Sequence, residues 1–113
     1  MSLYIIYFNQ QWVGDHSPEW FASRGPMARA VVEEAKTSGV LVAAAGVDED
    51  ASRAFTADAT SGALEITSGL FAPKEQYIGG LTVVDVPDDE TAIMWAGKIA
   101  VACGWPQQLR RLY

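Results

Sequence analysis

The chain has 113 residues and a formal net charge of −6, with 50% apolar and 19% charged residues. This length predicts a single domain, residues 1–113, and the composition is typical of a soluble globular protein. No apolar run approaches the ~18 residues of a membrane span, and no Lys/Arg cluster is present to neutralise phosphates. The first residues show neither a basic region nor a cleavage site. We therefore expect a cytoplasmic protein without membrane or nucleic-acid partners.

The first third of the chain predicts a strand followed by helix. Residues 3–8 are continuously apolar and β-prone, which favours a central strand covered on both faces. Ser17 and Pro18 supply an N-cap and a proline at the first helical position. The pair 25–26, Gly-Pro, is expected to interrupt this helical turn and to open a second helix, which Gly39 ends.

Turn formers and apolar periodicity divide the rest of the chain. The dipeptide Ser61-Gly62 indicates a hairpin turn, and the acids 88–90 favour the start of a helix that Gly104 ends. The elements expected here are a strand at 40–45, hairpin strands at 54–57 and 63–67, a strand at 81–86, a helix to residue 103 and a terminal strand within 107–113.

This order of elements indicates the fold class. Without the hairpin it reads strand, helix, strand, strand, helix, strand, which predicts an α+β fold of the ferredoxin-like, split βαβ type. We expect an antiparallel sheet with two helices on one face and an inserted β-hairpin. The opposite sheet face would be apolar and too large for a chain of this size to hide, so a homodimer is expected.

The stretch 67–80 combines turn formers, a charged pair and the entry to a strand. It resembles the motif of the YCII-related (YciI-like) family in its DGPF-domain subgroup, which begins Asp-Gly-Pro-Phe, continues with Lys-Glu and ends on Gly-Gly. The matching residues are Gly69, Phe71, Lys74, Glu75, Gly79 and Gly80. Ser68 stands at the motif aspartate and Leu70 at its proline, so the motif is degenerate there. The resemblance implies a fold of the dimeric α+β barrel type, and much of this family has no assigned reaction.

The charged pair of this stretch is the first candidate for a site. A loop constrained by glycine and proline can hold Lys74 and Glu75 in a pocket, with Glu75 as the candidate catalytic base or ligand hook. The alternative is an exposed ion pair of little energetic weight. Ser68 offers a hydroxyl in place of a carboxylate, which argues for lost or altered chemistry. Phe71 belongs to a set of aromatic residues that either line a ligand cavity or pack in the core and dimer interface.

Three further residues were weighed as site or core residues. His16, the single histidine, lies either at a pocket rim or in solvent, and it excludes any site that needs a histidine pair. Some YciI-like members carry a histidine in the first helix, where this chain has Ala28. Arg111 lies where that family has an arginine in its last strand, and either it or Arg110 faces inward or the dimer seam. Cys103, the single cysteine, is expected in the core.

Two functions remain open at this level. The first is binding of a small organic molecule, without catalysis, in a cleft beside residues 67–80; the alternative is a small dimeric enzyme that performs proton transfer, of isomerase, lyase or hydrolase type. Whether the protein is an enzyme is left open. No metal site and no cofactor are expected, since the ligand sets and nucleotide motifs are missing. The candidate ligand-binding residues are Ser68, Phe71, Lys74, Glu75, Arg111 and His16.

Overall fold

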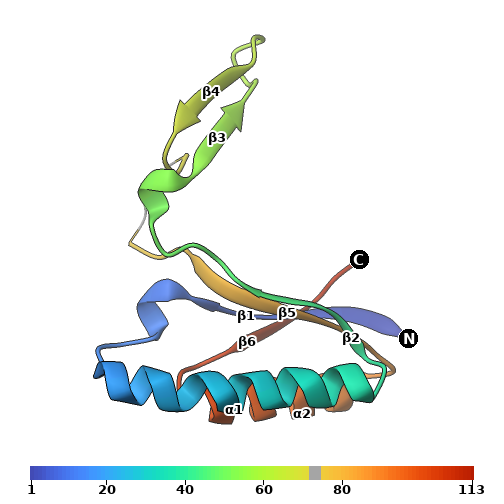
Figure 1. Cartoon of the computed structure of the whole chain (residues 1–113). Coiled ribbons are helices and arrows are strands. Elements are labelled where there is room, and N and C mark those ends of the chain that lie inside the picture. The colour runs from blue at the N-terminus through green and yellow to red at the C-terminus, as the bar shows by residue number, and fades with distance from the viewer. Residues whose placement is uncertain (72–74) are drawn as a thin grey trace.

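A computed structural model of the protein describes residues 1–71 and 75–113 (Figure 1). The described residues form, in chain order, β1 (Ser2–Asn9), η1 (Gln10–Trp12), α1 (Pro18–Thr37), β2 (Leu41–Gly46), η2 (Ala51–Arg53), β3 (Phe55–Asp58), β4 (Glu65–Ser68), β5 (Ile78–Val86), α2 (Asp89–Cys103) and β6 (Gln108–Arg111). The predicted strands, the hairpin and the helix that ends at residue 103 are present, with bounds shifted by a few residues. None of the helices in the described ranges is long and apolar enough to cross a membrane.

Four strands form one sheet in the order β2-β5-β1-β6, and each neighbouring pair is antiparallel. β1 and β2 therefore run parallel with β5 between them, which is the split βαβ arrangement. Both helices cover one face of this sheet (Figure 1). The predicted ferredoxin-like α+β fold is confirmed. The strands β3 and β4 form the predicted hairpin, which rises on the side of the sheet opposite the helices.

The two faces of the sheet differ in cover. Tyr4 and Ile6 of β1 are 2% and 0% exposed beneath the helices, whereas Leu3 on the other face is 39% exposed. The prediction that both faces of this strand are covered is therefore wrong within one chain, although its central place in the sheet is confirmed. We call the uncovered side the open face. The strand register assigns to it Leu3, Ile5, Tyr7, Ala43, Ala45, Leu81, Val83, Asp85, Gln108 and Arg110.

The core lies between the sheet and the helices. Its buried members are Tyr4, Ile6, Ala35, Val84, Val86, Ala92, Trp95 and Ile99. Three of them recur along α2 at helical spacing, as the sequence pattern predicts for a helix with one buried face. Burial of such side chains contributes about 1.5 to 3 kcal/mol each.

α1 is one continuous helix from Pro18 to Thr37, so the predicted interruption at Gly25-Pro26 is wrong. Proline inside a helix removes one backbone hydrogen bond, and its ring clashes with the Cβ of the preceding residue. Gly25 has no Cβ, which removes the second problem. The helix is also held at both ends, because the Ser17 hydroxyl accepts a hydrogen bond from the Trp20 amide at 3.1 Å and the Ser38 amide donates to Glu34 O at 2.9 Å.

The glycine pair Gly79-Gly80 belongs to β5 and not to the loop before it, because the strand begins at Ile78 and not at residue 81. A Cβ at Gly80 would lie 2.6 Å from Cε1 of Phe8, its partner across the strand pair. The pair therefore serves the close approach of an aromatic ring to the sheet. Unusual backbone angles are found earlier, at Gly69, whose φ is +91°.

Candidate functional site

A cleft of about 400 Å³ lies between α1 and the sheet, near the β2 edge. We call it the α1–sheet cleft. α1 contributes two pairs of residues, each one helical turn apart, and α2 contributes one such pair. The lining residues are Phe8, Ala28, Arg29, Val32, Glu33, Ala44, Ala45, Gly46, Leu81, Thr82, Ile99, Cys103 and Gln107. Two of them, Ala45 and Leu81, belong by strand register to the open face.

The cleft exists because small residues face one another across the helix–sheet interface. Ala28 of α1 lies opposite Ala44 and Gly46 of β2, where larger side chains would fill the layer. The cleft is open to solvent on this side, since Ala44 and Gly46 are exposed. The sequence carried a signal for it in the alanine-glycine run 43–46. By itself the run predicts only a weak strand and not the cleft.

One residue of the lining, Gln107, carries a polar group without a partner among the described residues. The Gln107 side-chain nitrogen is buried, and no acceptor among the described residues bonds to it. An amide donor left unpaired away from water costs about 1 to 3 kcal/mol, so this atom favours a bound acceptor. Arg29 and Glu33 are exposed members of the lining and place one charge of each sign at the opening.

Cys103 is the single thiol of the chain and also lines the cleft. Burial raises the pKa of the Cys103 thiol, and the nearby positive charge of Arg24 offsets this only in part. The thiol therefore remains protonated at neutral pH, and a protonated thiol is a poor nucleophile. The expectation that Cys103 acts as a small core residue agrees with its partial burial.

A chain of aromatic contacts starts at Phe8, a residue of the cleft lining. The Phe8 ring lies edge-on to Trp105 at 5.1 Å, Trp105 lies 6.1 Å from Trp20, and Trp20 stacks on His16 at 3.6 Å. The His16 Nε2 atom also lies 3.0 Å from the Val13 carbonyl oxygen. His16 is thus held by packing, and it is not part of the lining of the α1–sheet cleft.

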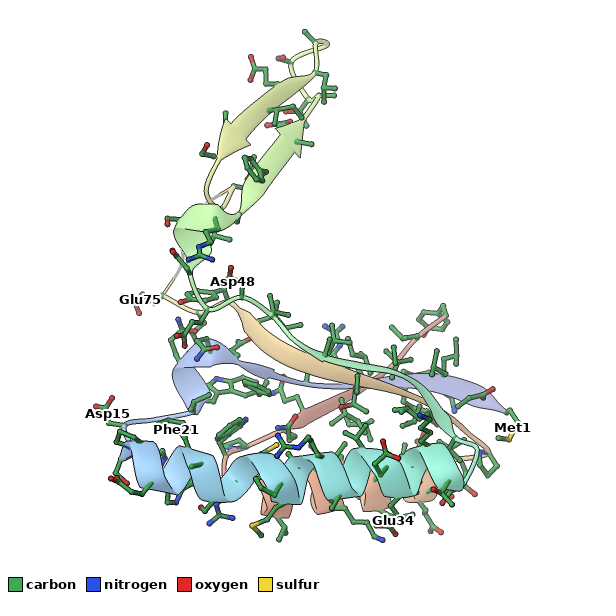
Figure 2. The ribbon with its side chains drawn as sticks, in the orientation of Figure 1. Met1, Asp15, Phe21, Glu34, Asp48 and Glu75 are labelled. Atoms are coloured by element: carbon green, nitrogen blue, oxygen red, sulfur yellow. The ribbon has the colours of Figure 1, made fainter. Side chains whose placement is uncertain are left out.

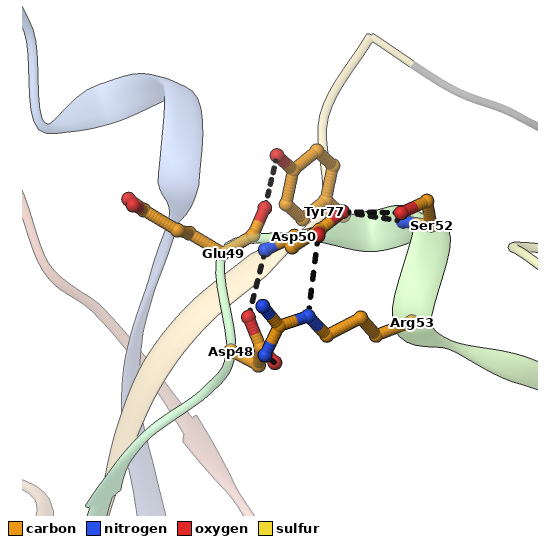
Figure 3. Close-up of polar contacts among 6 residues, drawn as sticks. All are labelled: Asp48, Glu49, Asp50, Ser52, Arg53 and Tyr77. Atoms are coloured by element: carbon orange, nitrogen blue, oxygen red, sulfur yellow. Dashed lines mark hydrogen bonds and ion pairs between the residues drawn. The ribbon is translucent and has the colours of Figure 1, made fainter.

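The structure does contain a small cleft beside residues 67–80, but its volume is only about 190 Å³. Its walls include Leu70 and Tyr77 from this stretch, and its polar groups bond to one another (Figure 3). The Tyr77 hydroxyl donates to Glu49 O at 2.9 Å, and Arg53 lies 3.2 Å from a carboxylate oxygen of Asp50. These bonds join the hairpin to the sheet. The geometry is that of a structural neck, which we define as residues 48–53 with Tyr77.

The predicted residues of the stretch 67–80 do not converge on a pocket. Glu75 is exposed at the base of the hairpin (Figure 2), and it lines neither the α1–sheet cleft nor the small cleft beside residues 67–80. Ser68 and Phe71 are exposed too, Phe71 to 75%. Lys74 lies outside the described residues, together with Ala72 and Pro73. Its pairing with Glu75 stays a prediction.

Arg111 has a structural setting at the other end of the sheet. Its guanidinium donates to the Tyr4 hydroxyl at 3.1 Å, and this hydroxyl donates to the Asp89 carboxylate at 2.5 Å. The Tyr4 hydrogen bond is the main cause of a raised pKa for Arg111. Arg111 pairs with Tyr4 of β1, whereas Ile78, near the end of the 67–80 stretch, pairs with Asn9 of the same strand. About 16 Å of β1 therefore separates Arg111 from this stretch. Arg110 projects on the open face.

In the described part of the chain, no group of three His, Cys, Asp or Glu side chains is placed to hold a metal ion. The cleft residues themselves are mostly apolar, so the arrangement is suited to binding. Comparison with known proteins found no family model and no curated protein that matches this chain, and the likeness to the YCII-related family accordingly stays an expectation from its motif.

Proposed function

We propose that this protein binds a small organic molecule in the α1–sheet cleft, without catalysis. The ligand class is a compact apolar body that carries one hydrogen-bond acceptor, such as a carbonyl or carboxylate oxygen. The observation that carries the proposal is that Gln107, a residue of the lining of this apolar cleft, has a buried side-chain nitrogen without a partner among the described residues.

The size and chemistry of the cleft support this ligand class. A volume of about 400 Å³ lies within the range of small-molecule sites, which are largely apolar with a few placed polar groups. Ile99 and Val32 supply apolar contact area at about 25 cal/mol for each Å² removed from water. A ligand acceptor that satisfies the Gln107 donor gains a further ~1 to 3 kcal/mol over one that lacks it, or roughly 5- to 150-fold in affinity.

The proton-transfer alternative receives no comparable support from the described residues. The titratable groups of the cleft are Arg29, Glu33 and Cys103, and the thiol of Cys103 is kept protonated by burial. Ala28, where the resemblance would place a histidine, contributes only a methyl group to the wall. The candidate base Glu75 lies outside the cleft. Glu33 is the one carboxylate of the lining and lies exposed at the opening, so binding is the function that the geometry favours.

The test is a thermal-shift screen of small carboxylic acids and ketones, each matched with its hydrocarbon analogue, followed by calorimetry of the hits. Ala44→Leu narrows the cleft and should abolish binding, whereas Ala22→Leu, at an exposed position of α1 outside the cleft, should leave it unchanged. Gln107→Leu should weaken the acids and ketones about 10-fold or more and spare the hydrocarbons. Hits that bind Ala44→Leu as tightly as the parent protein would place the site elsewhere.

A further inference from the structure

The β3–β4 hairpin has one apolar and one polar face. Strand pairing places Phe55, Ala57, Ile66 and Ser68 on one face and Thr56, Asp58, Glu65 and Thr67 on the other. The apolar face is uncovered in the chain, since Phe55 is 77% and Ile66 61% exposed. Leu64, next to the hairpin turn, is 69% exposed. We call residues 54–69 the arm.

The arm is too small to be stable on its own apolar contacts. An isolated two-stranded hairpin is marginal in water, and none of the arm residues belongs to the core described above. Its connection to the body lies at the neck, where Asp48 and Asp50 bond to Arg53 (Figure 3). At the base of the arm, the Thr56 hydroxyl donates to Gly69 O at 2.8 Å. The first two contacts lie in the neck, and the third closes the base of the arm itself.

We propose that the arm packs its apolar face on a second copy of this chain, which also covers the open face of the sheet. The arm rises on the same side as the open face (Figure 1). Each copy therefore presents both uncovered apolar surfaces, and a single two-fold axis that stacks the open faces brings each arm alongside the other copy. A different protein would have to match the two surfaces separately.

The surface areas favour a second copy of the chain as the partner, and they indicate that the dimer interface must include the arm. Four strands about 4.8 Å apart and about six residues long make the open face about 400 Å² in projection. A standard interface buries about 800 Å² on each partner, so the open face alone supplies about half of it. The paired strands of the arm add about 130 Å², and its turn with Leu64 adds more. A stable dimer of this chain thus needs contact from the arm as well as from the sheet.

The experiment compares the dimerisation of four full-length proteins by sedimentation equilibrium from ~1 to ~100 µM. The parent chain should form a dimer of twice its 12.2 kDa mass. Phe55→Ser with Ile66→Ser should raise the dissociation constant about 100-fold or more, since each dimer loses four buried side chains. The control, Asp58→Asn with Glu65→Gln on the polar face of the same arm, should change it by less than about 5-fold. Val83→Lys, at the centre of the open face, should abolish the dimer.

Hydrogen exchange keeps the test decisive if the arm variant folds poorly. In the parent chain, the amides of residues 55–58 and 65–68 should exchange more slowly at ~100 µM than at ~1 µM, because the dimer covers the arm. A monomeric parent chain at ~100 µM would refute the proposal. A second result would also refute it: Val83→Lys disrupts the dimer, but the Phe55 and Ile66 substitutions do not change the dissociation constant, and the exchange of the arm amides does not depend on concentration. The dimer would then leave the arm to another partner.

Discussion

Substitution of Gly104 tests the contact between the end of α2 and the chain of aromatic contacts. Gly104 and Gly39 end the two helices in the left-handed region, with φ of +87° and +77°. An alanine in this region costs about 1 to 2 kcal/mol, and the reduced freedom of the unfolded chain returns about 0.4 to 1 kcal/mol. Gly39→Ala should therefore lower the free energy of unfolding by about 1 kcal/mol, since its Cβ meets nothing within 4 Å.

Gly104→Ala carries a second cost. Its Cβ would lie 2.7 Å from Cζ2 and 2.9 Å from Cη2 of Trp20. The Trp20 ring is held between His16, stacked at 3.6 Å, and the Arg24 guanidinium, 4.9 Å from its centroid. It has to shift against both neighbours, and overpacking of this kind costs about 1 to 3 kcal/mol. We expect Gly104→Ala to destabilise the protein by about 2 to 4 kcal/mol in total.

The assay is urea denaturation followed by far-ultraviolet circular dichroism, with near-ultraviolet spectra of the native states to report on Trp20. Both variants are compared with the parent at several protein concentrations, because a dimer makes apparent stability depend on concentration. If Gly104→Ala and Gly39→Ala lower the stability equally, within ~0.5 kcal/mol, and the near-ultraviolet spectrum is unchanged, then Trp20 does not press on Gly104.

Two further predictions concern carboxylates. The hydroxyl and amide of Thr91 lower the pKa of Asp88 below its ordinary value of 3.8, so the N-cap stabilises α2 above that value and loses its effect as the pH falls through the lower folded pKa. In thermal melts, Asp88→Asn should therefore reduce the fall of the melting temperature as the pH drops below about 4. An unchanged fall would contradict the role of Asp88 as the cap. Glu75→Gln should leave both the melting temperature and the affinity for ligands of the α1–sheet cleft unchanged, because Glu75 is exposed outside the cleft. Weakened binding in calorimetry would return Glu75 to the site.

Elements were predictable wherever a local signal agreed with the tertiary packing. Asp88 and Gly104 mark the ends of α2 by their own backbone chemistry, and both positions were read correctly. Pro26 was misread because its local signal is a helix break, while the tertiary contacts of α1 and the missing Cβ of Gly25 allow the helix to continue. Local rules predict the behaviour of a segment alone, and packing decides between two outcomes of similar energy.

The site was harder to predict, because a cavity is a property of several segments together. The stretch 67–80 attracted attention through its charges and glycines, yet its glycine pair serves the packing of Phe8. The α1–sheet cleft depends on what is missing: large side chains at Ala28 and Ala44, and a partner for Gln107. The small residues of the run 43–46 can be seen in the sequence, but their place opposite Ala28 cannot. Such a gap becomes visible only when the facing elements are placed together.

The strand β5 connects the two proposals and also keeps them separable. Its side chains alternate, so Thr82 faces the α1–sheet cleft while Val83 faces the open side. A substitution at one of these positions therefore tests one surface and leaves the side chains of the other in place. The two surfaces are not fully independent, because both are formed by the backbone of β5. A shift of its register by one residue would move the side chains of one surface to the other. If the ligand and the second copy are coupled, the coupling must pass through β5, and dimerisation should then change ligand affinity by the same factor by which ligand changes dimerisation.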